Sequence, residues 1–429
     1  MPRNKDRKRL VRARMAETGE SYTRALTALE LRNAMADQVD APLDLGKDLP
    51  DAVLAALRTV PRHLFTPGEP LASAYGDVYT SIVTKRSERG TSLSSVSAPW
   101  IVAAMLAQLD VRPGESVLEI GSGGYQAALL RELAGPDGSV TTVDIDPEVT
   151  ARARACLDLA GYRDVRTLLA DGEHGAPGHG PFDKIIVAVQ ARDIPPAWTG
   201  QLAPHGRLVT PLLTRGVSRS WELHREGGHL VSRSNGPAGF VPMQGAGKHH
   251  GWSVDEAGVR LWSDEPASVD RAALAGVLGT ERAEAWSGVT LPRGTLITGP
   301  DLWLATDPDH CQLKAGQDAV ERGLVDASAA MNTPALASGG SLAYRARLRP
   351  VDDEGTAFEF GAYGHGPRGA ELAERLAGHI RTWDRDHRHG PGPVLTVHPA
   401  STRASELPRG HVLNRRHTTM VLSWPQTAP

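Results

Sequence analysis

Residues 117–125 read VLEIGSGGY, an apolar run that passes directly into a glycine-rich turn. The apolar part, Ser116 to Ile120, predicts a short buried strand, and Tyr125 to Leu133 predicts a helix. Glycines between a strand and a helix let the backbone come close to a ligand, and the start of the helix favours polar or anionic groups. The sequence therefore predicts a ligand-binding turn made by Gly121, Ser122, Gly123, Gly124 and Tyr125.

Strands and helices alternate outward from this turn. Ala98 to Leu109 predicts an amphipathic helix, Val140 to Ile145 a strand, and Glu148 to Ala160 another helix. Further strands are predicted at residues 165–170, 184–189 and 206–211. Strands separated by helices of this length favour a parallel sheet that is covered on both faces. We therefore predict an α/β protein with a Rossmann-like core.

Acidic residues stand where a nucleotide-type ligand would meet them. Asp144, followed by Ile145, ends the next predicted strand, and a carboxylate there accepts hydrogen bonds from ribose hydroxyls. Asp171 and Gly172 end another strand and are placed to contact an adenine. Glu119, two residues ahead of the first glycine, would repel a pyrophosphate but would hold the ammonium of a methionine moiety. These residues favour S-adenosylmethionine over NAD, and a Rossmann-like fold that binds no nucleotide is the alternative.

Composition excludes several classes of protein. The formal net charge of -3 over 429 residues gives no reason to expect nucleic acid or a membrane surface as partner. The sequence has no run of 18 apolar residues, so no transmembrane helix is expected. No apolar stretch follows the basic N-terminus, so no signal peptide is expected. Cys156 and Cys311 match no metal or redox spacing, and no histidine has convincing ligand spacing. We expect a cytoplasmic protein without a metal site.

Three regions are expected along the chain. Residues 1–48 form a basic helical segment, in which Met1 to Arg14 holds seven Lys or Arg and one Asp. It is either a solvated helix end or a basic arm for an acidic peptide or RNA. Residues 49–247 form the catalytic core. Residues 248–429 form a mixed α+β extension with strand-like runs such as Leu302 to Ala305, a helix at 369–383 and strands at 394–398 and 418–424.

Several motifs between residues 50 and 243 resemble, in their order, the protein L-isoaspartate (D-aspartate) O-methyltransferases. They are Val60-Pro-Arg-His-Leu-Phe65, Ala74-Tyr-Gly-Asp77, Ser97-Ala-Pro99, Leu118-Glu-Ile-Gly121, Tyr125-Gln-Ala-Ala128, Phe182-Asp-Lys-Ile-Ile186, Gln201-Leu-Ala-Pro204, Gly206-Arg-Leu-Val209 and Phe240-Val-Pro242. Each motif is weak alone, and together they are specific. The resemblance covers less than half of the chain and implies methyl transfer from S-adenosylmethionine to a carboxylate.

The departures from that family are as informative as the matches. Residues 79–97 correspond to the segment that carries the substrate-facing loop in that family; here they are rewritten and rich in hydroxyls and cations. Asp193-Ile-Pro-Pro-Ala-Trp198, residues 239–247 (GFVPMQGAG) and Leu302-Trp-Leu-Ala-Thr306 resemble the methyltransferases of FxLD lanthipeptide systems. That resemblance implies esterification of an aspartate in a thioether-cyclised precursor peptide, leading through a succinimide to isoaspartate, with the extension recognising the peptide.

Other functions stay open at this point. A housekeeping enzyme that repairs isoaspartate in damaged proteins is the first alternative. A peptide- or RNA-binding protein with a decayed methyltransferase core is the second, and a small-molecule or RNA methyltransferase is the third. The intact Glu119, Asp144 and Asp171 weigh against decay.

The resemblance also suggests which groups orient the acceptor. A carboxylate with a pKa near 4 is ionised at pH 7 and needs no general base, so hydroxyl donors suit the task of orienting it. Ser97 matches the family's loop serine, and Ser95 and Ser94 lie beside it as further candidates. The alternative is that Ser97 caps the helix that follows at Ala98 and Pro99.

Overall fold

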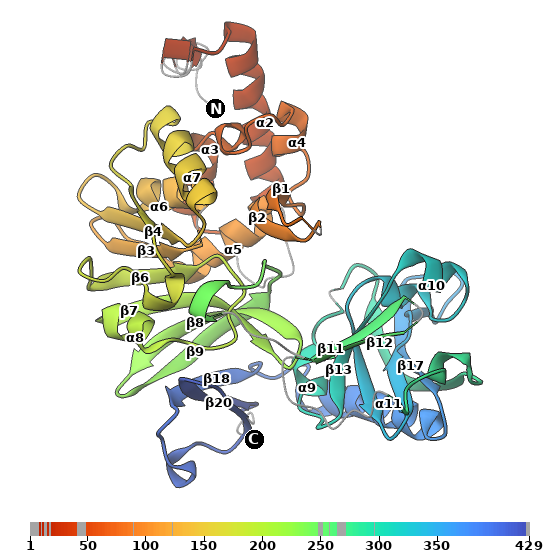
Figure 1. Ribbon diagram of the computed structural model, residues 1–429. Helices are drawn as coiled ribbons and strands as arrows, with labels where there is room; N and C mark the ends of the chain where they lie inside the picture. The colour runs from red at the N-terminus through yellow and green to blue at the C-terminus, as the bar shows by residue number, and fades with distance from the viewer. Residues whose placement is uncertain are drawn as a thin grey trace.

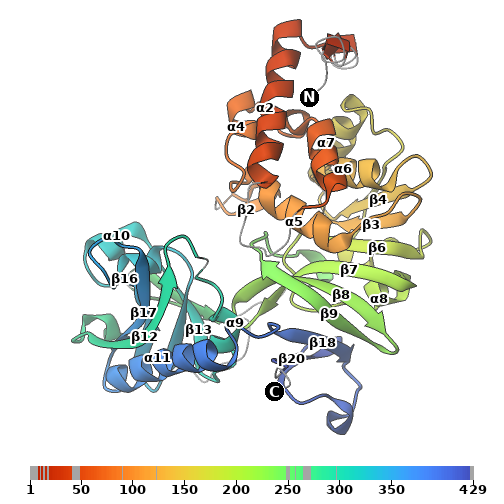
Figure 2. The ribbon, with the colours of Figure 1, turned by 180° about the vertical axis from the view of Figure 1, so that it is seen from behind.

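The computed structural model describes residues 8–9, 11–12, 15–16, 19–40, 49–88, 90–121, 123–247, 252–256, 258–263, 272–295 and 297–425; for 252–256 it describes the backbone alone. Figures 1 and 2 show two lobes that meet near the middle of the molecule. The first lobe contains residues 19–247 together with 394–425, and the second lobe contains residues 252–386.

A sheet of ten strands forms the centre of the first lobe. Its strands are β3 (Ser116–Ile120), β4 (Ser139–Asp144), β5 (Arg166–Leu169), β6 (Phe182–Val187), β7 (Leu202–Thr214), β8 (Val217–Glu226), β9 (His229–Pro237), β18 (Val394–Pro399), β19 (His411–Asn414) and β20 (Thr418–Ser423). They lie in the order β19-β20-β18-β9-β8-β7-β6-β3-β4-β5. The pairs from β7 to β5 are parallel, which confirms the predicted Rossmann-like centre, whereas every pair from β7 to β19 is antiparallel.

Helices lie around the parallel part of this sheet, some in contact with its strands and others packed on those helices. They are α2 (Tyr22–Asp40), α3 (Asp51–Thr59), α4 (Leu71–Tyr75), α5 (Pro99–Leu109), α6 (Tyr125–Ala134), α7 (Pro147–Leu159) and α8 (Pro196–Gln201). The start of α7 follows from its sequence, because the Asp146 side chain accepts hydrogen bonds from the backbone N–H groups of Glu148 and Val149 and Pro147 occupies the first turn. A short antiparallel hairpin, β1 (Ile82–Arg86) and β2 (Ser92–Val96), lies beside α5 and α7.

The last strands return to the first lobe. β18 pairs with β9 through Thr396 opposite Val231 and Val397 opposite Leu230, and β20 follows β18 in the sheet. Figure 1 shows these strands below β9, well apart from the second lobe's own sheet. The prediction of one extension over residues 248–429 did not foresee this return, because a strand pattern does not say which edge the strand joins.

The second lobe has its own antiparallel sheet and one long helix. Its strands are β10 (Trp252–Glu256), β11 (Val259–Ser263), β12 (Ala283–Pro292), β13 (His310–Ala315), β14 (Thr333–Ser338), β15 (Ser341–Arg345), β16 (Arg349–Pro350) and β17 (Ala357–His365). Its helices are α9 (Asp301–Leu304), α10 (Gln317–Glu321) and α11 (Gly369–Asp386). Figure 2 shows α11 across one face of the sheet, where it buries Leu372, Leu376 and Ile380. The mixed α+β character is confirmed.

One short element of the second lobe differs from its prediction. The apolar run Leu302 to Ala305 is expected as strand-like, but α9 occupies Asp301–Leu304. Short apolar runs do not distinguish a buried strand from a buried helical turn. The acidic Asp301 directly after Pro300 is a helix-start signal that outweighs the apolar pattern.

The turn between β7 and β8 packs against the second lobe. Arg215 and Gly216 both have positive φ, at 48° and 88°, as a two-residue hairpin turn requires. Arg215 donates a hydrogen bond from Nη2 to the Pro308 carbonyl at 2.8 Å, and a Cβ at Gly216 would lie 2.5 Å from Cγ of Gln312. The tip of this hairpin is therefore packed closely against the second lobe.

The N-terminal segment is helical where it is described. α2 begins at Tyr22, near the predicted Ser21, whereas much of the basic stretch before it lies outside the described residues. Among the described helices, none is both long and apolar enough to cross a bilayer.

Candidate functional site

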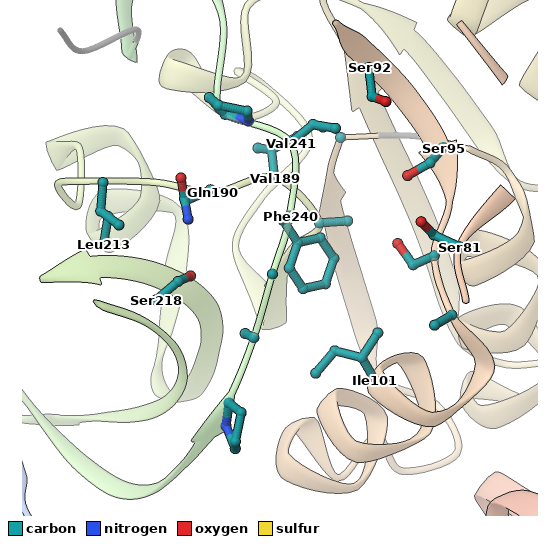
Figure 3. Close-up of a pocket in the computed structure, with 18 of the residues that line it drawn as sticks. Ser81, Ser92, Ser95, Ile101, Val189, Gln190, Leu213, Ser218, Phe240 and Val241 are labelled. Carbon is teal, nitrogen blue, oxygen red and sulfur yellow. The ribbon is translucent and has the colours of Figure 1, made fainter. Parts of the chain in front are cut away.

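A cavity of about 960 Å³ opens where the two lobes and the β1–β2 hairpin meet. Figure 3 shows Ser95 and Ser81 on one wall, with Phe240, Gln190 and Ser218 on the opposite side. Eight of the predicted site residues line it, namely Ser94, Ser95, Ser97, Glu119, Gly121, Gly123, Tyr125 and Asp144. Gly124, Ile145, Asp171 and Gly172 do not line it, and Ser122 lies outside the described residues.

The glycine turn is shaped for close backbone approach. Gly121 has φ of 91°, and a Cβ there would lie 2.8 Å from Cγ1 of Val189. Gly124, with φ of 81°, is the N-cap of α6. A Cβ on Gly123 would be 3.4 Å from the Ser95 carbonyl oxygen, so the turn lies directly against the hairpin. Gly121 requires glycine both for conformation and for space, and Gly124 requires it for its positive φ.

Two buried polar groups at this turn have unmet hydrogen-bonding capacity. Glu119 is fully buried; Oε2 accepts a hydrogen bond from the Thr142 hydroxyl, while Oε1 has no partner among the described residues. Burial raises the pKa of Glu119 to about 8, with the neighbouring Asp144 adding to the rise. Gln126 is 6% exposed, and its Nε2 has no partner within the described part of the chain. Both side chains line the cavity, so a ligand with an ammonium and a carbonyl or carboxylate would satisfy them.

Asp144 ends β4 at the rim of the same cavity. Its Oδ1 accepts a hydrogen bond from the backbone N–H of Asp146 at 2.9 Å, which holds the turn before α7. The register places Glu119 beside Thr142 and Asp144 beside Leu169, so the ends of β3, β4 and β5 meet at one edge. This is the edge at which open parallel sheets bind ligands.

Asp171 and Gly172 lie farther along that edge. Asp171 accepts hydrogen bonds from the backbone N–H groups of Glu173 at 2.9 Å and Ala246 at 2.8 Å, so both carboxylate oxygens hold turns in place. A Cβ at Gly172 would lie 2.6 Å from Cγ2 of Ile120, which explains the glycine by packing. Ile145 is 40% exposed and reaches the Gly245 turn. The structure therefore places these residues beside the cavity, and their contact with an adenine stays a prediction.

The three candidate serines differ in what their hydroxyls do. The Ser94 hydroxyl is buried and accepts hydrogen bonds from Thr84 Oγ1 and Arg152 Nη2, both at 3.1 Å. The hydroxyls of Ser95 and Ser97 line the cavity and bond to no other described side chain or backbone group. Ser95 and Ser97 are therefore available to a ligand, whereas Ser94 ties the hairpin to α7.

The alternative role of Ser97 as a helix cap is wrong. α5 begins at Pro99, its N-cap residue is Ala98, and no side chain caps it. What holds Ser97 is Arg62, a buried residue whose Nη1 donates to the Ser97 carbonyl oxygen at 2.9 Å. Sequence reasoning missed Arg62 as a functional residue; the signal was an arginine between Pro61 and His63 inside an otherwise apolar family motif.

The two hairpin cations that the structure describes, Lys85 and Arg86, do not line the cavity. Lys85 Nζ lies 2.7 Å from a carboxylate oxygen of Asp146 and of Glu148. Hydrogen bonds to these two carboxylates raise the pKa of Lys85. Arg86 donates to the Gly90 carbonyl within the hairpin turn. The hairpin is thus fastened to the start of α7 by charge and presents hydroxyls to the cavity.

Comparison with known proteins gives matches to one family. Residues 44–248 match the family described as Protein-L-isoaspartate(D-aspartate) O-methyltransferase. Protein-L-isoaspartate O-methyltransferase 2 of Archaeoglobus fulgidus is 37% identical over 220 residues, which cover 50% of this chain and 94% of that protein. The Protein-L-isoaspartate O-methyltransferase of Methanopyrus kandleri is 39% identical over 234 residues, covering 54% and 96%. A solved protein-L-isoaspartate O-methyltransferase is 17% identical, with a TM-score of 0.49 over 92% of this chain and 99% of that chain.

Proposed function

The chain belongs to the protein-L-isoaspartate(D-aspartate) O-methyltransferase family, and from this premise we propose that it methylates the carboxylate of an isoaspartyl residue in a peptide or protein. It is a carboxyl O-methyltransferase that uses S-adenosylmethionine. The observation that carries the proposed acceptor is that Ser95 and Ser97 share one cavity with Glu119 and Asp144.

The residues at the glycine turn fit S-adenosylmethionine. Glu119 and Gln126 offer an acceptor and a donor to the amino-acid end, and Asp144 would accept hydrogen bonds from the ribose. Gly121 and Gly123 leave room for close approach along the backbone. When bound, S-adenosylmethionine supplies an electrophilic methyl group to an acceptor oxygen.

The hairpin would hold the acceptor. An ionised carboxylate is already a nucleophile, so the protein's task is to orient it and exclude water. Hydroxyl donors from Ser95 and Ser97 can bind one carboxylate oxygen while leaving the other free. A tight ion pair with a guanidinium would weaken the nucleophile, and the described hairpin cations, Lys85 and Arg86, bond to other groups of the protein. Ser94 supports this arrangement through Arg152 rather than by contact with the acceptor.

A second acceptor is favoured by one feature of the molecule. The second lobe contributes Trp262, Gln312 and Asn332 to the cavity wall, and the named relatives account for only about half of the chain. We therefore keep as second candidate an aspartate in a thioether-cyclised precursor peptide, leading through a succinimide to isoaspartate, with residues 248–429 contributing recognition. The relatives' names support the repair-type acceptor, which the sequence alone places second.

One assay ranks these acceptors. The enzyme is incubated with methyl-labelled S-adenosylmethionine and three peptides of one sequence: linear isoaspartyl, linear aspartyl and thioether-cyclised aspartyl. Base-labile methyl ester is then measured as released methanol. Methylation of the isoaspartyl peptide is expected, and preference for the cyclised aspartyl peptide would move the second candidate to first place. No ester on any of the three would contradict the proposal.

A further inference from the structure

The wall of the cavity opposite the serines contains polar side chains that the proposed methyl transfer does not use. Gln312, on β13 of the second lobe, is 4% exposed and lines the cavity. Its side-chain amide bonds to no described residue. Ser218, near the start of β8, has a buried Oγ that also lacks a partner among the described residues. Figure 3 shows Ser218 and Gln190 on this same wall.

The direction of the Gln312 amide is set by the junction between the lobes. The stem of Gln312 packs against Gly216, where any larger residue would displace it. Arg215, beside this glycine, bonds to Pro308 and so locks the hairpin tip to the second lobe. On the other side Gln312 pairs across the sheet with Trp262, which also lines the cavity. The amide is therefore held between two rigid elements and faces the cavity.

A buried hydroxyl without a hydrogen-bond partner, such as that of Ser218, is energetically costly. Native proteins keep few such groups, and each needs an explanation. A carboxamide offers one acceptor and two donors without charge, which is the complement of a peptide group with its own N–H and C=O.

We propose that Gln312, assisted by Ser218, binds a main-chain peptide group of the substrate next to the residue that is methylated. This inference rests on the proposed function, because it takes the substrate to be a peptide. Gln312 would accept the N–H and donate to the C=O of that peptide group, while Trp262 packs against the adjoining residue. Because Gln312 would bind the main chain of the substrate, the enzyme should accept many side chains at the flanking positions but should require the flanking peptide bond.

The first test uses the unaltered enzyme and an isoaspartyl peptide series in which each flanking peptide nitrogen is N-methylated in turn. Loss of one N–H should raise KM about tenfold at a single position and leave kcat and the KM for S-adenosylmethionine unchanged. The second test repeats the series with Gln312→Leu, which keeps volume and removes both donor and acceptor. In this variant KM should rise about tenfold for the parent peptide, and the N-methylation effect at that position should disappear.

A matched control is available in the same lobe. Gln317, on α10, is exposed and bonds only to Glu321 among the described residues, so Gln317→Leu should leave both KM values unchanged. If Gln312→Leu does not fold, Ser218→Ala replaces it, with a smaller rise in KM expected. A flat N-methylation profile, or a profile that persists in Gln312→Leu, would overturn the inference.

Failure of the proposed function gives a different result. If the enzyme methylates none of the peptides, that proposal fails, and binding of the parent peptide is measured by calorimetry with S-adenosylhomocysteine present. Binding that weakens about tenfold in Gln312→Leu still supports the main-chain site. Binding that Gln312→Leu does not change, or no binding at all, overturns it.

Discussion

Arg62 donates a hydrogen bond from Nη1 to the carbonyl oxygen of Ser97 at 2.9 Å. The same guanidinium donates to the Ala74 carbonyl at 2.9 Å and lies 5.0 Å from the centre of the Tyr125 ring. Burial lowers the pKa of Arg62, but the group stays charged because an arginine starts so high. The buried Arg62 guanidinium thus connects Ser97 to Tyr125, the first residue of α6.

Replacing Arg62 should therefore affect rate as well as stability. In Arg62→Met the carbonyls of Ala74 and Ser97 lose a buried donor, at about 1–3 kcal/mol each. We expect a lower thermal midpoint and methyl transfer slowed at least tenfold in the fraction that stays folded, with little change in the KM for S-adenosylmethionine. Arg62→Lys should recover part of the rate. The control is Arg58→Met, which removes a surface ion pair with Asp37 and should change stability by under about 1 kcal/mol.

Ser97→Ala separates orientation from folding. Loss of the hydroxyl should slow single-turnover methylation by about ten- to a hundredfold, equivalent to about 1.4–2.7 kcal/mol. The thermal midpoint should hold, since Ser97 caps no helix. Ser94→Ala should lower the thermal midpoint and leave the methylation rate nearly unchanged, because the Ser94 hydroxyl accepts hydrogen bonds from Thr84 and Arg152. An unchanged rate in Ser97→Ala would leave Ser95 as the orienting hydroxyl.

Asp144→Ala should weaken the binding of S-adenosylmethionine. A carboxylate that accepts hydrogen bonds from a ligand contributes roughly 1.5–3 kcal/mol for each bond, so the loss in affinity should exceed tenfold. Titration calorimetry measures it directly. Asp137→Ala, in the exposed turn before β4, is the matched control and should bind normally. Equal affinities in the two variants would show that the ribose site is elsewhere.

Glu119 predicts a pH dependence with a definite sign. Its pKa is about 8 in the folded protein against an ordinary 4.5, so the folded state holds a proton that the unfolded chain releases. The contribution of this proton to the free energy of unfolding is complete below about pH 4.5 and is lost as the pH rises through 8. Thermal midpoints of Glu119→Gln, which cannot ionise, should lack this decline between pH 5 and 8.

The same proton should be released when S-adenosylmethionine binds. An ammonium next to Glu119 favours the ionised form, so binding below pH 8 should expel a proton. Calorimetry in two buffers with different ionisation enthalpies measures that release. Glu119→Gln should show none, and release of equal size in both proteins would place the titrating group elsewhere.

Local sequence patterns determined the centre of the first lobe. The strand Ser116–Ile120 was predicted with its observed ends, and the predicted helix from Ala98 lies within one residue of α5. Both follow from hydrophobic period, proline position and glycine turns, which act over a few residues. The acidic residues at the ends of β3 and β4 could be placed for the same reason, since parallel strands end at a common edge.

Only the tertiary structure decided which side chains in the cavity remain available to a ligand. Ser94 and Ser95 are neighbours of one residue type, yet Arg152, far along the chain, occupies the hydroxyl of the first alone. Gln312 enters the site because a hairpin tip of the first lobe packs against it. The return of β18 to β9 likewise depends on strand edges far apart in sequence. Such contacts depend on how elements far apart in the sequence pack together, and neither the hydrophobic period nor the spacing of motifs along the chain predicts that packing.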